Sequence, residues 1–375
     1  MTPPAPSPSF HRVSTQAAFA EGALEGVAPV ESDGDAITLM GTGPGSWTGP
    51  WVEPGFDVEE LIPSWNAETP PGSVVEVELE ARTHVGYETG WYPLGRWAYD
   101  DAAFERTSVA GREDEFGRVD IDTFRAATRL AAYRLRLTLS AAGAGAPTVR
   151  LVGAVASAGG NPPPAESTPG DAAGVELAVP PYAQSIHAGE YPRYGGGGAS
   201  WCSPTATAMV MAYWDAGPTP TDYAWVDPSI ADPWVDHAAR FTFDYGYAGT
   251  GNWPFNTAYA GHFGLEAFVT RLRSLREAEL FVTAGIPLVA SIAAAPGELD
   301  GFLLPQGTDG HLVVVVGFTP DGSPIVNDPA ATSNATVRRV YDRSQLERAW
   351  LDGSGGVVYV IRGPGAQVPP SRGNW

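Results

Sequence analysis

Two stretches in the first half of the chain alternate apolar and polar residues with a period of two. Residues 74–81 (VVEVELEA) and 133–139 (YRLRLTL) have this pattern, which is typical of β-strands with one buried face. Residues 36–40 and 148–154 are further expected strands, and Gly and Pro residues separate these segments without a convincing helical pattern. The pattern therefore predicts a β-sandwich domain over residues 36–156.

The composition changes after this region. Residues 157–174 (SAGGNPPPAESTPGDAAG) are rich in Pro, Gly, Ser and Ala and contain almost no large apolar residue, which is typical of a linker. A chain of 375 residues is long enough for two domains, and we place the boundary in this linker. Residues 1–35 are expected to form an irregular lead-in and residues 363–375 a C-terminal tail.

Beyond the linker the pattern becomes mixed. Residues 204–214 predict a helix with Ser203 near its N-cap, and residues 274–284 predict an amphipathic helix that ends at Gly285. A third helix is expected over residues 343–350, and the expected strands are 286–293, 311–318, 324–327, 337–341 and 357–362. Helices and strands in this order predict an α+β domain over residues 175–362.

Charge and hydropathy exclude several classes of partner. Asp and Glu number 43 against 22 basic residues, and the resulting net charge of -21 repels phosphate backbones, so no nucleic-acid partner is expected. No segment approaches the run of about 20 apolar residues that a membrane helix needs. Residues 1–12 lack a secretory signal pattern, which favours the cytoplasm by default, with secretion of a trimmed mature form as the alternative.

The chain contains one cysteine, Cys202, which excludes an internal disulfide and a multi-cysteine metal site. Nucleotide-binding and HExxH motifs are also absent, so neither a cofactor nor a metal is expected. Cys202 opens the helix expected from residue 204, where the helix dipole favours a thiolate over a thiol. A free cysteine is commonly a small buried hydrophobe, but the Gly-rich loop 195–198 before it leaves room for a substrate.

A nucleophilic thiol needs a base, and His311 is the best-placed histidine. It begins the apolar strand 312–316, so its ring is expected at a strand end that faces a cleft. His187 in a loop and His262 after an aromatic segment are the alternatives.

The base in turn needs a group that orients its second ring nitrogen. Asp328 ends the next expected strand, 17 residues after His311, and antiparallel pairing of the two strands would bring it beside the histidine. Asp328 is also compatible with a simple turn before Pro329, and Asn327 is the neighbouring alternative on the other strand face.

Acyl transfer also requires donors for an oxyanion. The side-chain amide of Gln184, together with the backbone N–H of Cys202, is the candidate pair. The substrate cleft is expected to be lined by Trp201, Gly198, Gly310 and Trp253.

In these positions the C-terminal half resembles the papain-like cysteine peptidases, in the branch of double-glycine leader peptidases that process bacteriocin precursors. The matching residues are Gln184, Cys202 with Pro204, His311 in GHLVVVVGF, and Asp328 with Pro329. Over residues 175–362 the resemblance implies a papain-like fold with Cys202 as nucleophile, His311 as general base and acid, Asp328 as its orienting group, and Gln184 in the oxyanion hole. Ser203 departs from the glycine that the family usually has there. The usual fusion to membrane transporter domains is missing in this chain, so the processing of leaders during export is not expected.

Two functions follow from these observations. The first is a soluble cysteine peptidase that forms an acyl-enzyme on a peptide or protein substrate, or passes the acyl group to an amine instead of water. The second is a catalytically inactive peptidase-like protein whose β-domain binds a carbohydrate or a protein surface through its aromatic residues. Those residues are Trp47, Trp51, Trp65, Trp91, Tyr92 and Trp97.

Overall fold

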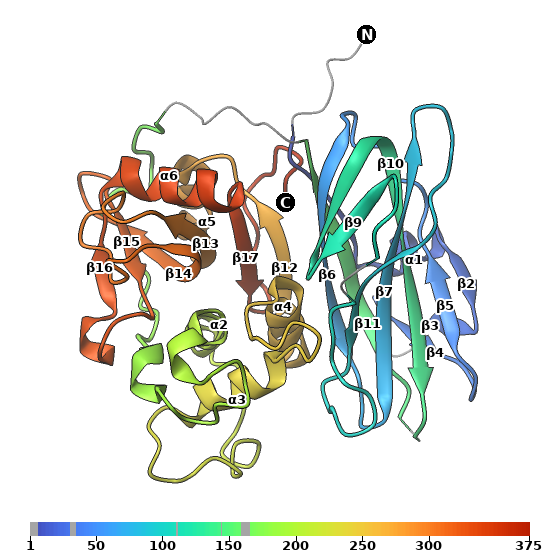
Figure 1. The fold of residues 1–375 in the computed structure, drawn as a ribbon, viewed down its shortest axis with the longest axis horizontal. Helices are drawn as coiled ribbons and strands as arrows, with labels where there is room; N and C mark the ends of the chain where they lie inside the picture. The colour runs from blue at the N-terminus through green and yellow to red at the C-terminus, as the bar shows by residue number, and fades with distance from the viewer. Residues whose placement is uncertain (1–6, 31–34, 110–111, 144, 159–165) are drawn as a thin grey trace. The chain divides into compact units, whose positions relative to one another are not determined.

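The structure is a computed structural model that describes residues 7–30, 35–109, 112–143, 145–158 and 166–375 (Figure 1). Contacts between Cα atoms divide the chain into two compact units. The first unit comprises Met1–Gly160, Asp244–Ala248 and Arg372–Trp375, and the second comprises Asn161–Phe243 and Gly249–Ser371.

The first unit is rich in β-structure, as the sequence predicts. Its longest strands are β6 (Val58–Glu68), β7 (Ser73–Thr83), β10 (Thr123–Ala141) and β11 (Thr148–Ser157), and β10 pairs antiparallel with β7 from Ala141 opposite Ser73 onward. Burial alternates over residues 75–79 of β7, because every second side chain there faces the core. The other elements are β1 (Ser9–Val13), β2 (Ala23–Glu25), β3 (Val27–Pro29), β4 (Ile37–Leu39), β5 (Gly45–Thr48), β8 (Tyr92–Trp97), β9 (Gly117–Asp120) and the short helix α1 (Gln16–Ala20).

The start of the chain differs from the irregular lead-in expected over residues 1–35. Strand β1 pairs antiparallel with β11, β2 with β5, and β3 with β4. These strands have three to five residues, too few to produce a recognisable alternation in the sequence. Residues 1–6 and 31–34 of the expected lead-in, and residues 159–165 of the expected linker, lie outside the described residues.

Four of the six aromatic residues considered for ligand binding pack in the core of the first unit. Trp47, Trp65, Tyr92 and Trp97 are each at most 1% exposed. The half-buried ring of Trp51 is covered by guanidinium groups, since the Cζ atoms of Arg82 and Arg134 each lie 4.6 Å from its centroid. The half-buried Trp91 lies under the side chain of Arg136, at 4.1 Å. These six rings are therefore occupied by intramolecular packing and cation–π contacts.

The second unit contains a six-stranded antiparallel sheet with the order β12-β17-β13-β14-β15-β16. The strands are β12 (Glu266–Arg271), β13 (Leu288–Ala294), β14 (Thr308–Phe318), β15 (Pro324–Asn327), β16 (Arg338–Val340) and β17 (Val357–Arg362). Residues 311–318 of β14 are all buried, in agreement with their continuous apolar run. This strand is the centre of the unit's core.

Helices cover this sheet. Helix α2 packs against β14, α4 against β12, and α6 against β13, and Figure 1 shows α5 and α6 above the strands and α2 to α4 below them. The elements are α2 (Cys202–Tyr213), α3 (Pro233–Thr242), α4 (Trp253–His262), α5 (Leu275–Thr283), α6 (Arg343–Ser354), and the short turns η1 (Gln184–His187), η2 (Gly198–Ser200) and η3 (Asn334–Thr336). None of the helices in the described residues has the length and apolar character that crossing a bilayer requires.

The helices and strands of the second unit confirm its mixed composition, but α3, α4 and β12 lie at residues for which no helix or strand was expected. Helix α4 is buried at every position from 254 to 260, so its sequence has no polar face to mark a helical period. Strand β12 is likewise buried except at its first residue.

The glycine near the end of β14 is required by a close backbone contact. A Cβ atom on Gly317 would lie 2.4 Å from the carbonyl oxygen of Val175 and 2.8 Å from the Cα atom of Glu176, in the segment that leads to η1. We expect Gly317→Ala to lower the free energy of unfolding by about 1–3 kcal/mol, because backbone must move to relieve the clash. Gly310→Ala on the same strand has open space around its Cβ position and should change stability by less than about 0.5 kcal/mol. Denaturant unfolding of the two variants tests this, and equal losses would contradict it.

Candidate active site

Cys202 is the first residue of α2, and the surrounding packing fixes its position. Residues 203–211 of the helix are buried, whereas Cys202 itself is only half-buried. The residue before it, Trp201, is fully buried, and its indole N–H donates to the carbonyl oxygen of Tyr194 at 2.6 Å. The thiol therefore lies at the N-terminal end of a rigidly held helix, where the helix dipole favours negative charge.

Ser203, where the resemblance led us to expect glycine, does not face the thiol's surroundings. Its side chain is 1% exposed, and its hydroxyl forms a 2.8 Å hydrogen bond with the hydroxyl of Tyr359 on β17. The hydroxyl pair ties the first turn of α2 to the sheet. The serine that replaces the expected glycine is therefore accommodated within the core.

The environment of Cys202 favours the thiolate. Burial raises the pKa of the thiol, but a hydrogen bond and the charge of His311, together with the backbone N–H groups of Leu312 and Ser203, lower it below its ordinary value of 9.0. Burial also lowers the pKa of His311, yet the charge and hydrogen bond of Asp328 and the contact with Cys202 raise it to about 10. These opposite shifts favour a thiolate–imidazolium pair at neutral pH.

His311 and Asp328 meet at the edge where β14 pairs with β15. The pairing is antiparallel, with Val314 opposite Asn327. Asp328, which follows β15, therefore comes close to His311, the first buried residue of β14. Nε2 of His311 lies 2.7 Å from Oδ1 of Asp328, and both side chains are at most 2% exposed. Because Nε2 is engaged by the carboxylate, Nδ1 is the ring nitrogen left for Cys202.

The alternative residues point elsewhere. Asn327 donates its side-chain amide to the carbonyl oxygen of Val179 at 3.2 Å, on the other face of β15. His187 is fully buried against Glu190 and Asp236 instead of the thiol.

Two residues that the sequence analysis missed complete the surroundings of the His311–Asp328 pair. The hydroxyl of Tyr341 donates to Oδ2 of Asp328 at 2.8 Å, and the ring of Phe302 packs edge-on against His311 with 5.9 Å between centroids. The backbone N–H of Ala330 donates to Oδ1 of Asp328 at 2.9 Å. Burial raises the pKa of Asp328, but His311 and these donors lower it below its ordinary value, so the carboxylate stays ionised. Tyr341 ends an expected strand, yet nothing in its local sequence marks it as a partner of Asp328.

Gln184 lies in η1, which is hydrogen-bonded to the loop after Asp328. Its backbone N–H donates to the carbonyl oxygen of Pro329 at 2.8 Å, and the preceding N–H, of Ala183, donates to Oδ1 of Asn334 at 2.8 Å. The side-chain Nε2 donates to the carbonyl oxygen of Ala199 at 2.8 Å, in η2, three residues before Cys202. The amide is 5% exposed and has a second hydrogen for another acceptor.

The four residues expected to line a cleft have different environments. Trp201 is buried with its indole N–H bonded internally, so the expectation of a substrate contact is wrong for this side chain. Gly198 is buried beneath η1, where a Cβ atom would lie 2.4 Å from the carbonyl carbon of His187. Gly310 is exposed beside His311 and Trp253 is half-buried in the first turn of α4, so both retain accessible surface.

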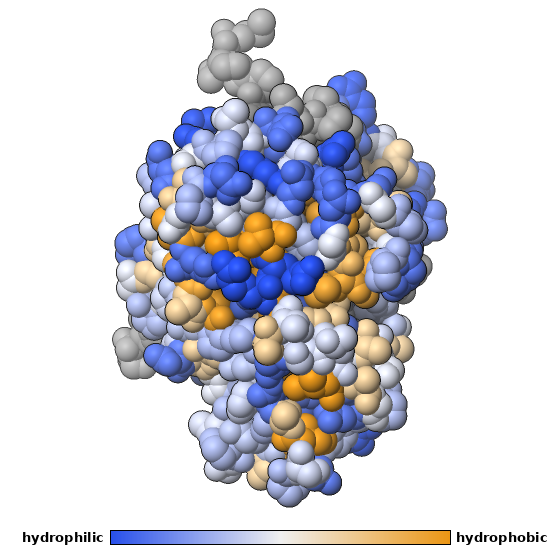
Figure 2. Space-filling view, turned by 90° about the vertical axis from the view of Figure 1, so that its left-hand side faces the viewer, coloured by the Kyte–Doolittle hydropathy of each residue, from blue (hydrophilic) through white to orange (hydrophobic). Residues whose placement is uncertain are grey.

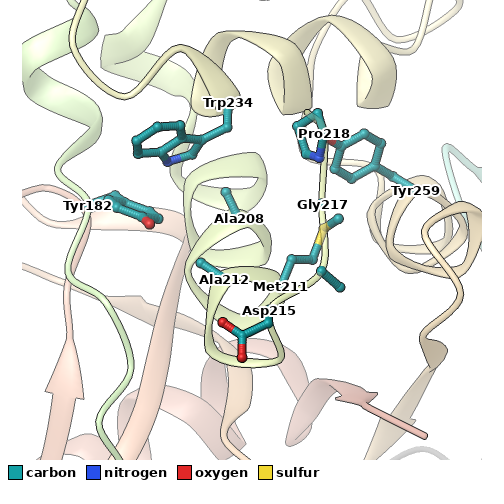
Figure 3. Close-up of a pocket in the computed structure, with 10 residues that line it drawn as sticks. Tyr182, Ala208, Met211, Ala212, Asp215, Gly217, Pro218, Trp234 and Tyr259 are labelled. Atoms are coloured by element: carbon teal, nitrogen blue, oxygen red, sulfur yellow. The ribbon is translucent and has the colours of Figure 1, made fainter. Parts of the chain in front are cut away.

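A pocket of about 310 Å³ lies at the other end of α2 (Figure 3). Aromatic rings of Tyr182, Trp234 and Tyr259 surround it, with Met211 and Asp215 below them. None of Cys202, His311, Asp328 and Gln184 lines this pocket, so it is separate from the candidate site.

Two carbohydrate-binding modules are among the solved structures to which this chain is weakly similar. The C-terminal CBM6 of LamC, a laminarinase from Zobellia galactanivorans, is 12% identical, with 39% of this chain and 98% of that chain covered and a TM-score of 0.23. A β-1,3-glucan binding CBM6 from Bacillus halodurans is 19% identical, with 40% and 97% covered and a TM-score of 0.21. Scores this low carry no argument about fold or function. No match was found among curated proteins.

Family models match both halves of the chain. Residues 9–157 match the Peptidase C39 N-terminal domain, and residues 176–356 match the Peptidase_C39 like family. The second match covers Cys202, His311, Asp328 and Gln184 and agrees with the resemblance to cysteine peptidases. Residues 176–356 therefore belong to the Peptidase_C39 like family, and a Peptidase C39 N-terminal domain over residues 9–157 precedes them.

Proposed function

We propose that this protein is a cysteine peptidase that hydrolyses amide bonds of peptide substrates through Cys202, His311 and Asp328. The observation that supports this most directly is the continuous series of polar contacts from the Cys202 thiol through His311 to the buried carboxylate of Asp328. A nucleophile, a base and an orienting group in hydrogen-bond contact are the components that acyl transfer through a thioester needs.

In the proposed acylation step, the Cys202 thiolate attacks the substrate carbonyl carbon, and the carbonyl π electrons move to its oxygen. The second Nε2 hydrogen of Gln184 and the backbone N–H of Cys202 are the proposed donors to this oxyanion. When the tetrahedral intermediate collapses, the C–N bond breaks and Nδ1 of the His311 imidazolium gives its proton to the leaving amine. A thioester on Cys202 and a neutral His311 remain.

In the proposed deacylation step, neutral His311 takes a proton from water, which attacks the thioester carbonyl. The C–S bond then breaks, the carboxylic acid product leaves, and the thiolate–imidazolium pair is restored. Asp328 keeps the ring in one orientation throughout and offsets its positive charge. An amine in place of water would give acyl transfer from the same intermediate.

We further propose that the second unit adopts the papain-like arrangement and that the first unit is a β-sandwich. The placement of Cys202 at the start of α2, opposite a histidine at the head of an apolar strand, supports the former. The long antiparallel strands with alternating burial support the latter. The alternative of a ligand-binding β-domain on an inactive peptidase-like unit is disfavoured by the ionised triad and by the internal contacts of the six aromatic side chains.

The first test is the pH dependence of Cys202 alkylation by iodoacetamide. Cys202 is the only cysteine, so intact mass reports on this thiol alone. Because the pKa of Cys202 is lowered from 9.0, we expect rapid alkylation to persist below that pH. His311→Ala removes the opposing charge and should move the profile to higher pH. The proposal fails if Cys202 reacts only after unfolding, or with the same profile in both proteins.

The second test separates oxyanion stabilisation from thiolate formation. Gln184→Ala is expected to reduce cleavage of a peptide library by about 10²–10³-fold. The same substitution should leave the alkylation rate of Cys202 nearly unchanged, since alkylation by iodoacetamide develops no tetrahedral oxyanion. A parallel loss of both rates would instead indicate a disrupted helix start and would remove Gln184 from the proposed mechanism.

The third test concerns Asp328 and Tyr341. Asp328→Asn removes the charge that raises the pKa of His311, so the alkaline limb of the pH profile for peptide cleavage, which needs the His311 imidazolium, should move to lower pH. Tyr341→Phe removes one donor to that carboxylate and should produce a smaller shift, as expected for a positioning residue. Tyr359→Phe is the matched control, because it also removes a buried hydroxyl but contacts Ser203. An unchanged profile in Asp328→Asn would contradict the assigned role.

A further inference from the structure

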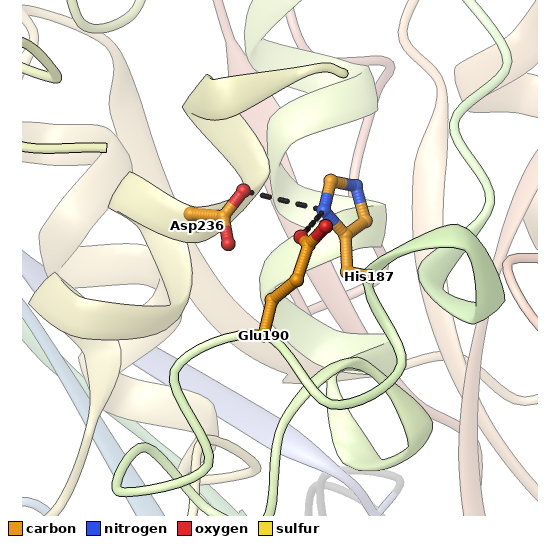
Figure 4. A group of neighbouring side chains, drawn as sticks. All are labelled: His187, Glu190 and Asp236. Carbon is orange, nitrogen blue, oxygen red and sulfur yellow. Dashed lines mark hydrogen bonds and ion pairs between the residues drawn. The ribbon is translucent and has the colours of Figure 1, made fainter. Parts of the chain in front are cut away.

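Three side chains of the second unit form a cluster that the proposed peptidase reaction does not use. Nδ1 of His187 lies 2.8 Å from Oε2 of Glu190 and 3.2 Å from Oδ2 of Asp236, and Figure 4 shows both carboxylates directed at the same ring nitrogen. His187 and Asp236 are fully buried, and Glu190 is half-buried. His187 ends η1, Glu190 follows three residues later, and Asp236 lies in the first turn of α3.

The protein by itself does not satisfy every polar atom of this cluster. Among the described residues, both oxygens of Asp236 lack a hydrogen-bond partner of acceptable geometry, although each has lost access to water. Nδ1 of His187 carries at most one hydrogen, and two carboxylates compete for it. The buried carboxylate of Asp236 and the half-buried one of Glu190 also share a single imidazole, which carries at most one positive charge. A bound cation would give the Asp236 oxygens a partner and would also offset the excess negative charge.

We propose that His187, Glu190 and Asp236 form a binding site for one divalent metal ion of the zinc class. Imidazole nitrogen and carboxylate oxygen are ligands that Zn²⁺ accepts at about 2.0–2.2 Å, which puts the ligand atoms of a tetrahedral site roughly 3.4 Å apart. The observed separations of 2.8 and 3.2 Å are slightly shorter than that spacing, and the three candidate ligand atoms all lie within 4.8 Å of one another, so small side-chain movements would admit the ion. The two carboxylates would offset the +2 charge, and the side chain of Glu190 keeps part of its surface exposed to solvent.

The site would join two parts of the second unit. The ring centroid of His187 lies 6.1 Å from that of Trp201, directly before Cys202, and η1 also carries Gln184. A metal bound here would connect η1 to α3. It would thereby help to fix the positions of Gln184 and Trp201 beside the candidate active site. The inference stands on the cluster's own geometry and does not depend on catalysis by Cys202.

The test is zinc binding to the full chain after removal of metals with a chelator. The titration uses Cys202→Ser, so that the thiol cannot contribute a zinc ligand. Calorimetry with zinc alone is expected to give one site with a dissociation constant of about 1 μM or lower. Binding should release protons, because the metal takes the place of the proton at Nδ1. Zinc should also raise the melting temperature.

Variants locate the metal. Asp236→Asn and Glu190→Gln keep the shape of each side chain and should each weaken zinc binding at least tenfold. Glu190→Gln is the safer variant for folding, since this side chain is half-buried. The matched control is His84→Gln, which removes an exposed histidine paired with Asp57 in the first unit and should leave binding unchanged.

The outcomes are distinct. Zinc binding that is equal in all variants would place the metal elsewhere and overturn the proposal. No saturable binding up to about 1 mM zinc would also overturn it and would mean that a shared proton alone holds the cluster. Either result is independent of peptide cleavage, because the titrated protein lacks the thiol.

Discussion

The Asp328 carboxylate has no access to water, so protein donors must balance its charge, and these donors come from several elements. His311 comes from β14, Tyr341 follows β16, and the N–H of Ala330 belongs to the loop after β15. The same loop accepts the backbone N–H of Gln184 through Pro329. A buried carboxylate without these partners would strongly destabilise the fold. The arrangement of strands, loop and η1 around the candidate site is therefore linked to the stabilisation of one charge.

Local sequence was sufficient to predict the residues at the centre of this arrangement. Cys202 precedes a recognisable helix, His311 begins a continuous apolar strand, and Asp328 ends the next one, so each has a signal within a few positions. Strands β15 and β17 occur at the expected residues because their apolar runs are short and bounded by turns. The expected substrate contact of Trp201 was wrong, because an aromatic residue beside a nucleophile has the same sequence pattern whether its side chain faces a substrate or the core.

The features that the sequence did not predict depend on contacts between distant segments. Helix α4 is buried all round, which removes the polar face that marks a helical period. Tyr341 reaches Asp328 only because β15 and β16 pair. Asp236 is 49 positions after His187, in a helix that was not expected. No spacing rule relates such residues, and only the folded chain brings them together.

The buried ion pair of His311 and Asp328 also links the candidate chemistry to the acid and alkaline tolerance of the fold. The pKa of Asp328 is below its ordinary 3.8, so its share of the folding free energy is present above that pH and is lost as the pH falls through the lowered value. The pKa of His311 is raised above 6.5, so its share is fully present below 6.5 and is lost as the pH rises toward about 10. The two contributions overlap fully in mildly acidic solution. A substitution that changes the pKa of either side chain therefore also changes the pH range in which the folded state is favoured.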